Sequence, residues 1–166
     1  MGHPKVIALC VALLLASSSG CASLRWDLKK SFRKPGEKLA TFPEIVWEEY
    51  DCDTQQRPFF IIEENELVPP LVYPGGEFNH RMIYVMCPRE STQTVRGELQ
   101  TRIRFRGDPI VSKQTVTFEI KPGRWVVDAA VALPDQAEPG IYAYELVFRG
   151  RHLRFDKSLT FVVKAR

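Results

Sequence analysis

The sequence has 166 residues, with 23 lysines and arginines against 20 aspartates and glutamates, for a net charge of +3. This length allows one domain with a substantial core once a leader is removed. Residues 39–166 carry 16 basic and 18 acidic side chains. The body therefore lacks the positive surface that nucleic-acid binding requires, and we predict no nucleic-acid partner.

The first twenty residues predict an export signal. Lys5 is followed by the apolar run Val6 to Ala16 and then by the small residues Ser17 to Gly20. This run is too short to cross about 30 Å of hydrocarbon as a permanent helix. Residues 1–20 are therefore expected to be a signal peptide that is removed.

A short motif at the end of this leader predicts a lipid anchor. Ser18-Ser19-Gly20-Cys21 resembles the lipobox of bacterial lipoproteins, with Ser18 where that family usually has leucine. The resemblance implies cleavage before Cys21, followed by acylation of its thiol and of the new amino terminus with fatty acids such as palmitate. In an envelope with two membranes, the sorting rule of Gram-negative lipoproteins gives Ala22 a further meaning. It implies transfer to the outer membrane, facing the periplasm, because aspartate there is the usual retention signal. Ordinary secretion with a free Cys21 is the alternative.

Residues 21–42 are expected to form a basic, flexible tether. Residues 25–38 carry six basic side chains and two acidic ones, and Pro35-Gly36 interrupts any helix that starts before it. Basic residues beside a lipid anchor attract anionic head groups by up to about 1 kcal/mol each. Solvation of an unstructured linker is the alternative role of this charge.

Residues 43–166 predict a single all-β domain. Apolar residues alternate with period two in several segments, and no run has helical spacing over a sufficient length. The predicted strands are 99–105, 116–120, 125–133, 142–148, 153–155 and 159–163, with weaker ones at 45–50, 59–62 and 82–87. About seven or eight strands, with a long loop around residues 69–76, predict a two-sheet antiparallel sandwich, and a closed barrel is the alternative.

The segment Glu138 to Tyr144 carries a second resemblance. Its sequence, EPGIYAY, is similar to the start of strand F in immunoglobulin-like domains. The resemblance implies a tyrosine corner, in which the Tyr142 hydroxyl bonds a nearby backbone group. Tyr144 stands where antibody domains have a cysteine, so the central disulfide of that family cannot form.

The cysteines predict one disulfide. Cys10 leaves with the leader and Cys21 is taken by lipid, which leaves Cys52 and Cys87. An even remainder in an oxidising compartment favours a bond that closes a loop of about 35 residues. Two buried free thiols or one reactive cysteine are the alternatives. The sequence has no CxxC pair and few histidines, so we predict no metal and no cofactor.

The sequence does not predict an enzyme. It has no GxSxG elbow, and His80 and His152 are expected to be ordinary exposed residues. Acidic side chains gather in residues 44–53 and 63–66, where they are expected to protect exposed strand edges. A calcium site or a pair of catalytic carboxylates in these segments is the alternative.

A row of arginines predicts a surface for an anionic partner. Arg102, Arg104 and Arg106 occupy alternate positions of one predicted strand, with Arg96 upstream. Alternate residues lie about 6.6 Å apart, so the row is about 13 Å long. Guanidinium groups in this pattern suit phosphate or carboxylate groups. Pairing across the sheet with residues such as Glu119 is the alternative.

Together these features predict a lipid-anchored, non-catalytic binding or accessory subunit of an envelope assembly, with an envelope protein as its partner. A glycan or small-ligand module is the first alternative, with Trp47, Trp125 or Tyr73 as its platform. Trp125 is expected to be buried, which counts against that role. An enzyme with an acidic site is the second alternative.

Overall fold

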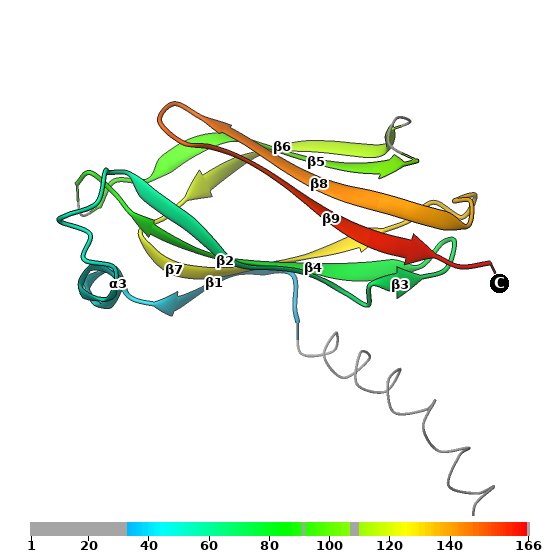
Figure 1. The fold of residues 1–166 in the computed structure, drawn as a ribbon, viewed down its shortest axis with the longest axis horizontal. Coiled ribbons are helices and arrows are strands. Elements are labelled where there is room, and N and C mark those ends of the chain that lie inside the picture. The colour runs from blue at the N-terminus through cyan, green and yellow to red at the C-terminus, as the bar shows by residue number, and fades with distance from the viewer. Residues whose placement is uncertain (1–32, 91, 107–109, 166) are drawn as a thin grey trace, which may run out of the picture.

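The computed structural model describes residues 33–90, 92–106 and 110–165. The predicted signal peptide, Cys21 and the first part of the predicted tether lie outside these residues. The described chain forms nine strands and one short helix, arranged as two packed sheets (Figure 1). Within these residues, no helix has the length and apolarity needed to cross a bilayer.

The two sheets form the predicted sandwich. The four-stranded sheet has the order β1 (Gly36–Thr41), β7 (Gly123–Ala132), β4 (Glu77–Cys87), β2 (Phe59–Val68). The five-stranded sheet has the order β3 (Leu71–Val72), β9 (Arg154–Val163), β8 (Gly140–Gly150), β5 (Val95–Phe105), β6 (Ile110–Ile120). All neighbours are antiparallel except β3 and β9. The prediction of an all-β, two-sheet fold is confirmed.

The strand order is that of an immunoglobulin-like domain. Strands β2, β4 and β7 occupy the positions of strands A, B and E, while β5, β8 and β9 occupy those of C, F and G. The position of strand D is filled by β1, which comes from the start of the domain. The Tyr142 hydroxyl donates a hydrogen bond to the Glu138 carbonyl at 2.9 Å, as expected for a tyrosine corner.

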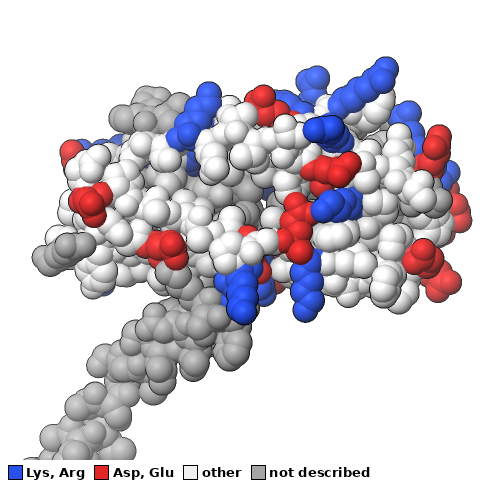
Figure 2. Space-filling model, turned by 180° about the vertical axis from the view of Figure 1, so that it is seen from behind, with Lys and Arg blue, Asp and Glu red and all other residues white. Residues whose placement is uncertain are grey.

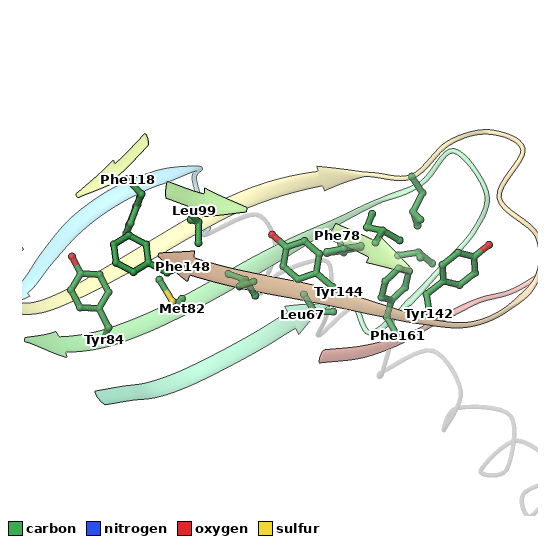
Figure 3. Close-up of a cluster of buried hydrophobic side chains, with 14 of the residues drawn as sticks. Leu67, Phe78, Met82, Tyr84, Leu99, Phe118, Tyr142, Tyr144, Phe148 and Phe161 are labelled. Carbon is green, nitrogen blue, oxygen red and sulfur yellow. The ribbon is translucent and has the colours of Figure 1, made fainter. Parts of the chain in front are cut away.

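The core lies between the sheets and is rich in aromatic side chains (Figure 3). Strand β4 shows why the sequence folds in this way. Its even-numbered residues point into the core, and they include Phe78, Met82 and Tyr84, each at most 1% exposed. Because side chains alternate along a strand, the odd-numbered residues lie on the outer face.

A second, smaller core covers the outer face at the end of β4. Helix α3 (Pro43–Glu49) places Val46 against Val85 and Cys87. Cys52 follows the helix and bonds Cys87, with a Cα–Cα distance of 6.0 Å. The predicted disulfide is confirmed, and it ties the helical segment to the central strand of the four-stranded sheet.

The predicted strand at residues 45–50 is wrong, because this segment lies mostly in helix α3. Pro43 occupies the first turn, where its missing N–H and fixed φ favour a helix. The helix has seven residues and buries only Val46. Such a short element shows no helical repeat in the sequence, which is why the pattern was ambiguous.

Two further strands lie where the sequence predicts none. Residues 36–41 of the predicted tether form β1, which pairs with β7. Just before it, Arg33 is buried and its Nη2 lies 2.6 Å from Glu66 Oε2, so the domain begins ahead of residue 43. The predicted loop at residues 69–76 contains the two-residue strand β3.

Candidate binding site

Strand β6 is an exposed edge of the five-stranded sheet. It is eleven residues long and pairs with β5 on one side. Residues 112–117 are all exposed, and Val116 is 41% exposed. The strand carries one lysine, one glutamate and no proline. A long edge with so few charges offers its backbone N–H and C=O groups to a further strand.

Strand β7 also has a free stretch on the same side of the sandwich. Its pairing with β1 runs from Arg124 to Asp128. Residues 129–132 pair with β4, and the described chain places no strand on their other side. Because successive residues turn their N–H and C=O groups in opposite directions, two of these four residues direct theirs toward the free side.

A cleft of about 250 Å³ lies between these two strands. Its lining comes from β6 (Ser112, Gln114, Val116), β7 (residues 129–132) and the core-facing residues Leu99, Thr101, Ile103 and Tyr144, with Arg102 at its margin. Figure 2 shows this side of the molecule, where most of the side chains around a hollow are uncharged. The β6 edge, the free stretch of β7 and this cleft together form what we call the open side.

His80 lies in the core, and the prediction that it is exposed is wrong. It is 2% exposed, and its ring centroid lies 5.0 Å from that of Tyr144. His80 Nε2 lies 2.7 Å from Asn65 Oδ1, and neutral His80 with its proton on Nε2 donates this hydrogen bond. Burial lowers the pKa of His80 to about 4, so the ring is neutral at physiological pH. His152 is exposed, as predicted.

The structure pairs Arg102 and Arg104 of the predicted row with a residue of the neighbouring strand β8. Arg102 Nη2 and Arg104 Nε lie 2.8 and 2.9 Å from the same Glu145 oxygen. The prediction that Arg106 continues the strand is wrong, because β5 ends at Phe105 and Arg106 lies in a turn with a φ of 49°. The Arg106 guanidinium lies 4.7 Å from the centroid of the Phe105 ring, and Arg96 is exposed. Arg102 and Arg104 therefore pair across the sheet, which is the alternative role, with Glu145 as their partner.

Arg124 joins the two acidic segments, and the sequence analysis did not single it out. Its Nη2 lies 2.6 Å from Glu49 Oε1 and 2.8 Å from Glu63 Oε1. The hydrogen bond from Arg124 is the main reason why the pKa of Glu63 is lowered. These carboxylates thus tie α3, β2 and β7 together. Among the described residues, no three metal-ligating side chains lie close enough to hold an ion.

The candidate aromatic platforms lie on separate elements. Trp125, on β7, is half-buried against the core and donates its Nε1–H to the Pro122 carbonyl at 2.8 Å. Trp47, on α3, donates to Asp53 Oδ2 at 3.0 Å. Tyr73 is 49% exposed and follows β3.

No protein-family model and no curated protein matches the sequence. Among solved structures, a β-glucosidase from Erythrobacter marinus is similar over 64% of this chain and 15% of its own, at 11% identity and a TM-score of 0.46. A β-glucuronidase from Parabacteroides merdae is similar over 63% of this chain and 14% of its own, at 14% identity and a TM-score of 0.41. The chain spans a small part of these enzymes, and likenesses at this level carry no argument about activity.

Proposed function

We propose that the chain is a lipid-anchored, non-catalytic binding subunit of a cell envelope, held by Cys21, that binds a protein partner through the open side of its sandwich. The observation that carries the proposal is the pair of unpaired strand segments on that side, the β6 edge and residues 129–132 of β7. An added strand binds such an edge through its main chain, and side-chain pockets supply the specificity. The cleft between the two segments offers such a pocket.

Elsewhere in the described chain, the carboxylates that could serve in catalysis are paired with arginines, which supports a structural role for them. Glu49 and Glu63 share Arg124, while Asp128 Oδ2 lies 2.7 Å from Arg81 Nη2. A catalytic acid among these carboxylates would need a raised pKa, whereas that of Glu63 is lowered. The open side, in contrast, is lined mainly by uncharged side chains.

The anchor and the binding surface are tested separately. For the anchor, we expect radiolabelled palmitate to enter the wild-type chain, and Cys21→Ser to abolish the label and release the protein from the membrane fraction. A wild-type chain without label would contradict the lipid anchor.

For the binding surface, a photoreactive amino acid replaces Gln114, which is exposed and lines the cleft. The matched control replaces Ser158, which is exposed on the outer face of the five-stranded sheet, on β9. We expect cross-linked protein from position 114 in intact envelopes and none from position 158. The same products from both positions, or none from position 114, would contradict binding at the open side.

A further inference from the structure

We infer that the β6 edge pairs with β6 of a second copy of this chain, antiparallel, about a two-fold axis at Val116. This inference rests on the proposed binding function and names the occupant of the edge. A two-fold axis makes the contact self-complementary, so that one surface serves both copies and the assembly closes as a dimer.

Strand β6 is the least protected edge of the two sheets in the described chain. At the outer edges of the four-stranded sheet, β1 has six residues and includes two charges, and β2 has a bulge after Ile62 and three glutamates. At the other edge of the five-stranded sheet, β3 has two residues. Bulges, charges and short length all discourage strand addition. Strand β6 has an irregularity of its own at Val111, near its start, and residues 112–120 pair regularly with β5. Among the edges in the described residues, β6 alone combines length, exposure and few charges.

The charges of β6 select one register. With the axis at Val116, Thr115 lies opposite Thr117 of the second copy, and Lys113 lies opposite Glu119. The two-fold axis forms this ion pair twice. These four side chains share the outer face of the sheet, because they occupy odd-numbered positions of one strand. Opposite charges directly across an antiparallel pair are stabilising, as are paired threonines.

The neighbouring registers lack this complementarity. With the axis at Thr115, Lys113 lies opposite Thr117, and Glu119 lies opposite Val111. With the axis at Thr117, Lys113 lies opposite Lys121, which is repulsive. Thr94 Oγ1 donates to Glu119 Oε1 at 2.7 Å and so helps to hold the carboxylate on the outer face.

On the inner face of β6, a two-fold axis at Val116 would also create an apolar contact between the two copies. Val116 is 41% exposed and lines the cleft. In the dimer it would meet Val116 of the second copy, and Gln114 would lie opposite the largely buried Phe118. Two five-stranded sheets would then join into one, and both four-stranded sheets would lie on the same side of it.

Cysteine cross-linking of the full chain in the envelope tests the axis. In Val116→Cys the two new cysteines lie opposite each other, with Cβ atoms about 5 Å apart, so a disulfide can form after a small adjustment. In the matched variant Gln114→Cys they are offset by four residues, about 13 Å, which is too far. We expect a covalent dimer from the first variant, and from the second only the background of the wild-type chain, which carries the same Cys21.

Charge reversal tests the register. In the Val116→Cys background, Lys113→Glu creates two Glu–Glu pairs, and we expect association to weaken about tenfold. Adding Glu119→Lys restores both ion pairs and should restore the cross-linked fraction. Glu98→Lys is the matched control, because Glu98 is exposed one strand further in, beside Thr117.

A Val116→Cys chain that stays at the wild-type background overturns the inference, as does equal dimer from Gln114→Cys. Failure of the double charge reversal to restore the dimer overturns the register and with it the axis. If the probe at position 114 captures a different protein while Val116→Cys stays monomeric, the dimer fails and the proposed binding function stands.

Discussion

The two long sides of the sandwich differ in how their sheets are joined. On the side of β2 and β9, the chain leaves the four-stranded sheet at Val68, passes Pro69-Pro70 and pairs as β3 with β9 of the other sheet. The Val162 N–H donates to the Pro70 carbonyl at 2.9 Å. Phe60 of β2 stacks on Phe155 of β9 at 5.2 Å between ring centroids. The polypeptide therefore closes this side.

On the opposite side, β6 and β7 are joined by the turn at one end, residues 121–122. Beyond that turn, β1 covers β7 as far as Asp128, and the cleft follows. The difference indicates a division of roles. We propose that packing on the closed side supplies stability, and that the open side supplies the contacts of the proposed binding function.

The prediction with the largest expected effect tests whether the free energy of unfolding depends on packing at the closed side. Phe161 of β9 is 1% exposed and packs on Phe78 at 4.9 Å and on Tyr142 at 5.4 Å. Phe161→Ala should lower the free energy of unfolding by about 4 kcal/mol, because it removes a buried ring and leaves a cavity. Denaturant unfolding measures this change. Val116→Ala on the open side is the control and should cost less than 1 kcal/mol. Similar losses in the two variants would contradict the division of roles.

Acid should weaken the packing between the sheets through His80. Its pKa is about 6.5 in the unfolded chain and about 4 in the folded one, so the unfolded state binds more protons between these values. The free energy of unfolding should therefore fall by about 3 kcal/mol as the pH drops from 6.5 to 4. Unfolding curves across this range measure the slope.

His80→Gln removes the titrating ring and should flatten that slope. His152→Gln, at an exposed position, should keep the wild-type slope. If His80→Gln and wild type lose stability in parallel, burial of a neutral His80 is not the cause.

The tyrosine corner makes a smaller contribution near the closed side. Tyr142→Phe keeps the ring between Phe105 and Phe161 and removes the hydroxyl that bonds Glu138. We expect a loss of about 1 kcal/mol, the usual value of one hydrogen bond. Thermal unfolding measures it, with Tyr73→Phe at an exposed position as the control. An unchanged midpoint would show that the hydroxyl does not fix this corner.

The sequence predicted the parts of this fold that follow local alternation. The strands that include Leu99, Phe118 and Phe148 were found because apolar and polar residues alternate along each of them. The tyrosine corner and the disulfide were also predicted. Strand β1 escaped because it is short and mostly exposed, so no hydrophobic pattern marks it. His80 lies between the polar residues Asn79 and Arg81 and was therefore predicted to be exposed, although it shares a face with Phe78 and Met82.

The open side could not be predicted, because it depends on which distant segments pair. Residues 129–132 are free on one edge only because β1 ends its pairing at Asp128, about ninety residues away in sequence. For the same reason the sequence did not single out Arg124, because its two carboxylate partners come from separate, distant segments. Arg102 and Arg104 lie on one strand as predicted, and Arg106 follows that strand. Their partner Glu145 lies on a strand that periodicity alone does not place beside them.

The prediction with the smallest change in free energy concerns hydrogen exchange along β6, which distinguishes a strand that pairs with a second copy from a free edge. If β6 pairs in the dimer, every second amide in residues 112–117 is protected by the second copy, and the alternate amides are protected by β5. Hydrogen exchange of the wild-type chain should therefore show protection throughout this segment. Lys113→Glu should speed exchange at every second residue only, while Tyr144 and Leu146 of β8, which is paired on both sides, keep their rates. Alternating fast exchange already in the wild type would show that the edge is free and that the open side is not occupied there.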